Sequence, residues 1–160
     1  MKKWYADEKM AIMFSETPDA DFREITPEMS DKEAEKIAEK PFLNKKTIEV
    51  HLWDHQKHKH YRFTIKKGYT WDGATIPSFC WMFVGAKTDP RFTIASMIHD
   101  VLCINKGYVQ GDRYFATIVF DNCLKVAKVH PFKRWLMKHP MDNFQKTRHW
   151  EKWEEEDKKC

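Results

Sequence analysis

The sequence predicts one α+β domain, in which a small antiparallel β-sheet packs against a helical C-terminal half. Apolar and polar residues alternate over residues 47–53 and again over 61–65, which is the period of a half-buried strand. From residue 91 onward, apolar residues recur at the spacing of amphipathic helices. A length of 160 residues suits one domain, and 42% hydrophobic residues with a net charge of +4 argue against a disordered chain.

Residues 1–46 are expected to lead into this domain. The apolar run at residues 10–14 predicts a strand. Ser30 followed by Glu33 is the signature of a capping box, so a helix should begin there. This helix should end before Pro41, because the residue that precedes a proline is disfavoured in helical geometry. Its few apolar residues predict that it lies on the surface of the domain.

Residues 47–77 are expected to form a β-hairpin and a structured loop. The polar residues 54–59 separate the two alternating segments and suit a turn. The segment after the hairpin is punctuated by two glycines and a proline, which predicts a loop rather than a regular element. These three residues are Gly68, Gly73 and Pro77.

Residues 90–139 predict a helical hairpin and a third helix. Pro90 is well suited to open the first helix. The second helix is expected over about residues 111–128, and the third over 132–138, closed by the proline that follows. The highly charged residues 142–160 are expected to form a tail helix on the surface.

The first two of these helices carry residues that suit hydrolytic chemistry. Neighbouring helix residues point about 100° apart, so His99 and Asp100 face different directions. His99 borders the apolar face of its helix, and Asp112 begins the next helix, so the two should meet in the helical hairpin. A buried carboxylate that orients an imidazole is a common way to make histidine a general base.

A cation site is expected beside that base. Asp100 points away from His99 and is available to hold a cation. Asp72 and the backbone carbonyls of the glycine-containing loop offer further oxygen ligands, which calcium prefers. Calcium and zinc are therefore the candidate cofactors, and the assembled site predicts a metal-assisted hydrolase.

Three motifs follow one another over roughly residues 68–120. They read Gly68-Tyr-x-x-Asp72-Gly-Ala-Thr-Ile-Pro77, Ala95-x-x-Ile98-His99-Asp100 and Asp112-Arg113-x-Phe115. In this order they resemble a family of phage and prophage proteins of unknown function, with a G-F-x-T-D-G-A-S-I-P loop and helices that carry A-x-x-x-H-D-x-L-Y and A-D-x-x-F. The sequence departs from that pattern at Val101, Cys103 and Gly111.

The resemblance implies a viral protein from a bacteriophage or prophage, located in the host cytoplasm or the virion. Other phage proteins or a host protein are the partners it implies, and it leaves the activity open. A looser similarity links the H-D helix and the later Asp112 to secreted phospholipases, as an analogy of mechanism. Their cysteine framework and their Y-G-C-x-C-G-x-G-G loop are missing here.

The same site residues also fit a structural role. Histidine beside an apolar helix face is commonly a core residue, Asp112 suits the positive end of a helix, and Asp72 followed by Gly73 is a common turn pair. In this alternative the protein is a non-enzymatic virion component or host-interaction factor. Its site residues then only lock the loop against the helices.

Four histidines fall in the predicted hairpin: His51, His55, His58 and His60. Strand alternation places His58 and His60 on one face, and such pairs occur in zinc sites. The sequence places no cysteine nearby, and Asp54 is the closest carboxylate. A solvated hairpin tip is therefore the simpler interpretation.

A basic segment surrounds the third predicted helix, and the tail is acidic. The opposite charges of this basic segment and the acidic tail suit contact within one chain. A docking face for an acidic partner is the alternative. The basic residues are Lys125, Lys128, His130, Lys133, Arg134, Lys138 and His139.

Composition and missing motifs exclude several other classes. The sequence contains no run of about 18 apolar residues, and its charged N-terminus does not resemble a signal peptide. Acidic residues interleave with the basic ones, which argues against nucleic-acid binding. The 4 cysteines are widely spaced and are expected to be free thiols. P-loop, dinucleotide-binding and G-x-S-x-G motifs are missing.

Overall fold

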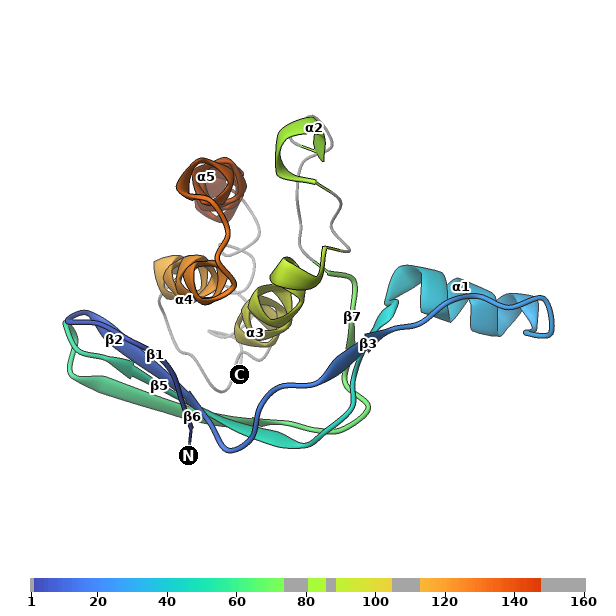
Figure 1. Ribbon diagram of the computed structural model, residues 1–160, viewed down its shortest axis with the longest axis horizontal. Helices are drawn as coiled ribbons and strands as arrows, with labels where there is room; N and C mark the ends of the chain where they lie inside the picture. Colours follow the sequence, from blue (N-terminus) through green and yellow to red (C-terminus); the bar gives the residue numbers. More distant parts are fainter. Residues whose placement is uncertain (1, 74–80, 86–88, 105–112, 148–160) are drawn as a thin grey trace, which may run out of the picture.

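The structure is a computed structural model, and it describes residues 2–73, 81–85, 89–104 and 113–147. A curved four-stranded sheet lies below a layer of helices, and a second, smaller sheet continues from one of its ends (Figure 1). This arrangement confirms the predicted α+β class, with antiparallel strands from the first half and helices from the second.

The larger sheet has the order β1-β2-β5-β6, and all its pairs are antiparallel. The strands are β1 (Lys2–Ala6), β2 (Met10–Phe14), β5 (Ile48–Asp54) and β6 (Lys59–Ile65). The predicted strand at residues 10–14 and the predicted hairpin are confirmed. β1 was not predicted, because its short segment has no clear alternation of apolar and polar residues.

The smaller sheet has the order β3-β4-β7. Its strands are β3 (Ala20–Phe22), β4 (Phe42–Asn44) and β7 (Thr70–Trp71). The prediction of a loop without regular structure after Gly68 is therefore wrong at residues 70–71. There Trp71 pairs with Phe42 across the sheet, and both side chains are buried.

Helix α1 (Asp31–Glu39) confirms both the predicted capping box and its surface position. The Glu33 backbone N–H donates to Ser30 Oγ (3.4 Å), and the Ser30 N–H donates to Glu33 Oε2 (3.1 Å). None of the residues in α1 is buried. In Figure 1 this helix extends away from the layer formed by the other helices.

Within the described residues, the helical half contains one short helix, three long helices and a 3₁₀ turn that leads into the first long helix. They are α2 (Trp81–Val84), η2 (Pro90–Phe92), α3 (Thr93–Ile104), α4 (Arg113–Val126) and α5 (Pro131–Thr147). Pro90 opens the turn that leads into α3, as expected. Helix α3 packs against α4, and α4 packs against α5. No helix within the described residues is long and apolar enough to cross a membrane.

The predicted end of the third helix before Pro140 is wrong. Pro140 lies inside α5, which continues to Thr147, so the first residues of the expected tail helix belong to α5. Proline removes one backbone N–H from a helix and destabilises it. Met137 and Met141 on either side of Pro140 are both buried, and this packing offsets the cost of the proline. Residues 148–160 lie outside the described part.

The core lies between the larger sheet and helices α3 and α4. Strand residues Ile12, Val50 and Leu52 are fully buried, as are Ile98 and Val119 on the helices. Each such side chain contributes about 1.5–3 kcal/mol through burial. On α4, Cys123 is a free and buried thiol, as expected, and burial raises its pKa to about 12.

Candidate functional site

The turn that precedes the candidate site is held by Asn44. The Gly68 N–H donates to the Asn44 carbonyl oxygen (2.8 Å), and the Asn44 N–H donates to the Tyr69 carbonyl oxygen (2.8 Å). The buried Asn44 amide also donates to the Lys66 carbonyl oxygen (3.1 Å). Gly68 has a φ of 90°, a conformation that other residues rarely adopt. These bonds fix the path of the chain into β7.

Trp71 attaches β7 to helix α3. Its ring is fully buried and stacks on Phe42, with 5.3 Å between ring centroids. Its indole Nε1 donates to Ser96 Oγ (3.0 Å), and the Ser96 hydroxyl donates to the Thr93 carbonyl oxygen (3.0 Å). A buried indole N–H needs such an acceptor, so this contact sets the position of β7 against α3.

The contact of Trp71 with Ser96 brings two predicted cation ligands near each other. Asp72 follows Trp71 directly, and Asp100 lies one helical turn beyond Ser96, on the same side of α3. The pKa of the Asp100 carboxyl is raised to about 7, mainly by burial and in addition by the charge of Asp72. Lys40, at the end of α1, acts in the opposite direction. Asp72 itself is exposed.

His99 faces the neighbouring helix, as its place beside the apolar face predicts. Its ring makes an edge-to-face contact with Phe120 of α4, with 5.5 Å between ring centroids. Burial lowers the pKa of the imidazole to about 4. His99 is therefore neutral near pH 7, the form that can accept a proton.

Of the remaining predicted site residues, Gly73 lies within the described part of the chain, whereas Pro77 and Asp112 do not. Gly73 follows Asp72 with a φ of 94° and is buried, so a glycine is required at this turn. The expected bond between His99 and Asp112 also lies outside the described residues. That bond therefore stays a prediction.

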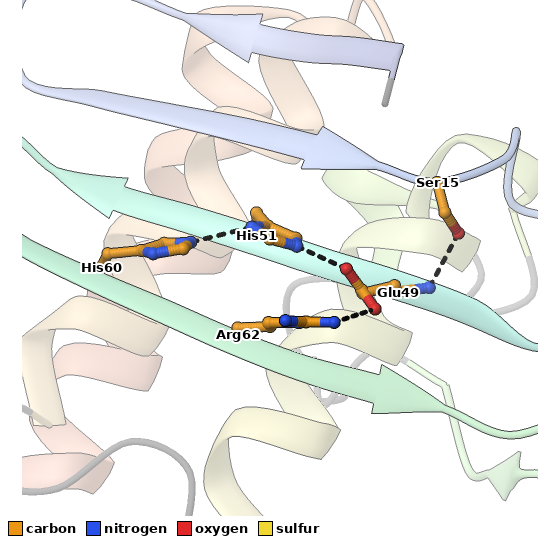
Figure 2. Close-up of polar contacts among 5 residues, drawn as sticks. All are labelled: Ser15, Glu49, His51, His60 and Arg62. Atoms are coloured by element: carbon orange, nitrogen blue, oxygen red, sulfur yellow. Dashed lines mark hydrogen bonds and ion pairs between the residues drawn. The ribbon is translucent and has the colours of Figure 1, made fainter.

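His55, His58 and His60 are exposed, as the interpretation of a solvated hairpin tip expects, but the two histidines that contact each other are not those that strand alternation placed on one face. His58 lies in the turn with a φ of 49°, and His60 contacts His51 rather than His58 (Figure 2). The associated carboxylate is Glu49 instead of Asp54. Asp54 accepts hydrogen bonds from backbone N–H groups of the turn. Strand alternation was applied across the turn residue His58, and this produced the wrong pair.

Sequence reasoning did not single out Asn44, Trp71 or Ser96. A polar Ser96 within the apolar start of α3, four residues before Asp100, was a signal that could have been used. Within the described residues, no group of three or more His, Cys, Asp or Glu side chains is placed to hold a metal ion. A cation at Asp72 and Asp100 would thus need further oxygen ligands from backbone or water.

The fold and site define an α+β protein with a half-buried neutral histidine on α3 and two carboxylates, Asp72 after β7 and Asp100 on α3, whose charges interact. The chain belongs to the family described as "Protein of unknown function (DUF1353)", whose model matches residues 48–139. The match begins at β5, ends within α5 and includes Asp72, His99 and Asp100. Comparisons with curated proteins and with solved structures found no match.

Proposed function

We propose that this chain is a metal-assisted hydrolase of bacteriophage or prophage origin, acting in the host cytoplasm or the virion. Asp72 and Asp100 bind a divalent cation, and His99 serves as the general base beside it. The observation that carries the proposal is that Trp71 bonds to Ser96, which places Asp72, directly after β7, on the side of α3 that carries Asp100, and that the charge of Asp72 raises the pKa of Asp100. Two adjacent carboxylates repel one another, and a bound cation removes that repulsion.

The chemistry of the ligands favours calcium, with zinc as the second candidate. Carboxylate oxygens, backbone carbonyls and water are the ligands that calcium takes in proteins. A bound cation polarises the substrate and lowers the pKa of a coordinated water. His99 would accept the proton of such a water in its neutral form. Because burial lowers the pKa of His99 to about 4 and so makes it a weak base, this step depends on the cation lowering the pKa of the water. In this proposal Asp112 orients the His99 ring.

A thermal melting experiment with CaCl2 and ZnCl2 tests the cation site. A ligand that binds only the native state stabilises it, by about 2.7 kcal/mol at a concentration 100 times the Kd. We expect the wild type to melt at a higher temperature with the cation and Asp100→Asn to show no shift. Asp21→Asn is the matched control, because it removes an exposed carboxylate that pairs with Lys45 elsewhere. A wild type that responds to neither ion contradicts the proposal.

The hydrolytic step needs a separate assay. We would screen lipid and peptidoglycan substrates with the wild type and Asp112→Asn. If Asp112 orients the base, this variant folds with a nearly unchanged melting temperature and loses turnover. If Asp112 is structural, it instead loses roughly 1–3 kcal/mol of stability, as expected when a buried polar contact is broken.

One observation favours a second candidate, a non-enzymatic protein that binds other phage proteins or a host protein. Four large apolar side chains on α2 and the start of α5 are exposed: Met82 (89%), Phe83 (58%), Phe132 (54%) and Trp135 (57%). The two helices are in contact, and contiguous exposed apolar surface often marks an interface. A binding function predicts that Trp135→Ser abolishes a measured partner interaction and leaves the cation response intact.

A further inference from the structure

The outer face of the larger sheet carries a network of polar side chains from β5 and β6. Alternation along β5 directs Val50 and Leu52 into the core and leaves Glu49, His51 and Trp53 on the opposite face. The register pairs His51 with Arg62 and Trp53 with His60, which brings all five outer residues together. Figure 2 shows the contacts running from His60 on β6 to His51 and Glu49 on β5 and back to Arg62 on β6.

The His51 ring is held by Glu49 through one of its nitrogens. The distance from His51 Nε2 to Glu49 Oε1 is 2.6 Å, and Arg62 donates to the other carboxylate oxygen (2.8 Å). An ionised carboxylate only accepts hydrogen bonds, so neutral His51 carries its proton on Nε2. Its Nδ1 therefore bears a lone pair. A carboxylate that fixes the tautomer of an imidazole in this way is a common feature behind histidine metal ligands.

The second imidazole is placed opposite that lone pair. His60 Nε2 lies 2.8 Å from His51 Nδ1. The His60 ring is held by Trp53, with 4.4 Å between ring centroids and an interplanar angle of 4°. His60 is exposed, so ions in solvent can reach this pair, whereas only 14% of the His51 side chain is exposed. Both rings are thus oriented by a neighbour before any ligand arrives.

We propose that His51 Nδ1 and His60 Nε2 form a two-imidazole site for a transition-metal ion, with Cu²⁺ and Ni²⁺ preferred. Two nitrogens bound at about 2.05 Å and at a right angle are about 2.9 Å apart, whereas tetrahedral coordination needs about 3.3 Å. The observed 2.8 Å is a hydrogen-bond distance, so the separation of the two nitrogens hardly changes when both rings turn them toward one tetragonal ion, whereas tetrahedral coordination also requires the rings to move apart. Water completes the coordination.

Metal binding requires one change of tautomer and no net loss of protons. In the metal-free pair, His60 Nε2–H donates to His51 Nδ1. When the metal binds, the His60 proton moves through solvent to its Nδ1, and both facing nitrogens then offer lone pairs. Glu49 keeps its bond to His51 Nε2–H and stabilises the positive charge on the ring. Glu49 is thus a positioning residue, not a ligand.

Calorimetric titration with Cu²⁺ and Ni²⁺, together with the EPR spectrum of one equivalent of Cu²⁺, tests this site. For the wild type we expect saturable binding of one ion and coupling of Cu²⁺ to two imidazole nitrogens. His60→Gln and His51→Gln should each lose one nitrogen coupling and most of the affinity. Glu49→Gln should keep both couplings and weaken binding by roughly 10-fold, as expected for an outer-shell partner.

Matched controls separate this site from other histidines and from the carboxylate pair. His55→Gln and His58→Asn each remove one imidazole from the hairpin turn and should bind Cu²⁺ like the wild type. Asp100→Asn should also keep its Cu²⁺ affinity, and His60→Gln should keep the melting response to calcium. Unchanged Cu²⁺ binding in a folded His60→Gln variant, checked by circular dichroism, would overturn the proposal. A wild type without saturable binding would overturn it too.

Discussion

Asp100 is mostly buried beside another carboxylate, so its ionisation opposes folding. Its folded pKa of about 7 lies above the ordinary value of 3.8. The folded chain therefore binds the proton more tightly than the unfolded chain. Stability from this group is present below pH 3.8 and is lost as the pH rises toward 7. Functional sites often contain groups that lower the stability of the folded protein, and ionised Asp100 is such a group.

This residue gives the first prediction. The free energy of unfolding of Asp100→Asn minus that of the wild type should rise between pH 4 and pH 7, by on the order of 3–4 kcal/mol without added metal. Denaturant unfolding at a series of pH values measures the difference. A difference that stays flat over this interval would show that Asp100 ionises normally and is not perturbed by Asp72.

The contribution of His99 to stability has the opposite dependence on pH. Its folded pKa of about 4 lies below the ordinary 6.5, so the unfolded chain binds the proton more tightly. Stability from the neutral imidazole is present above pH 6.5 and is lost as the pH falls toward 4. His99→Gln should remove a contribution that changes by roughly 3 kcal/mol over this interval. Unfolding curves for His99→Gln that run parallel to the wild type throughout would contradict the burial of the imidazole.

At the scale of elements, one side-chain contact joins β7 to α3 and thereby determines the site. If Ser96 is truncated, the Trp71 indole N–H is left buried without its acceptor, which costs about 1–3 kcal/mol. The same change should free Asp72 to move away from Asp100. The contact between Trp71 and Ser96 is thus expected to affect both the stability of the protein and the pKa of the Asp100 carboxyl.

A double-mutant cycle with Ser96→Ala and Trp71→Phe tests this expectation. The two changes remove the two partners of one bond, so together they should destabilise less than the sum of the singles, with a coupling of roughly 0.5–3 kcal/mol. Thr64→Ala, on the exposed face of β6, is the control and should show no coupling with Trp71→Phe. Additive effects of Ser96 and Trp71 would mean that the bond does not connect the elements.

Local sequence signals predicted the elements that local physics determines. The strand at residues 10–14, the hairpin and the capping box at Ser30 all follow from periodicity or from a short-range bond. The continuation of α5 through Pro140 depends on the burial of Met137 and Met141, which is tertiary. Similarly, the place of His99 beside α4 follows from its helix face, whereas the approach of Asp72 to Asp100 depends on Trp71 and Ser96.

For the whole molecule, the pH dependences of stability from the two half-buried titratable groups of α3, His99 and Asp100, oppose each other. Between pH 4 and pH 6.5 the loss of stability from Asp100 and the gain from His99 have opposite signs and similar slopes. Their sum is therefore nearly constant over this interval. The site between β7 and α3 can thus change its ionisation over this interval without a steep change in the overall stability of the fold.

The most direct measurement is the titration of the Asp100 carboxyl carbon by NMR, in the wild type and in Asp72→Asn, with and without calcium. We expect a wild-type midpoint near pH 7. We also expect a lower midpoint in Asp72→Asn, and in the wild type when calcium is added. A midpoint near the ordinary 3.8, or one that neither Asp72→Asn nor calcium moves, would contradict the proposal that these two carboxylates form a cation site.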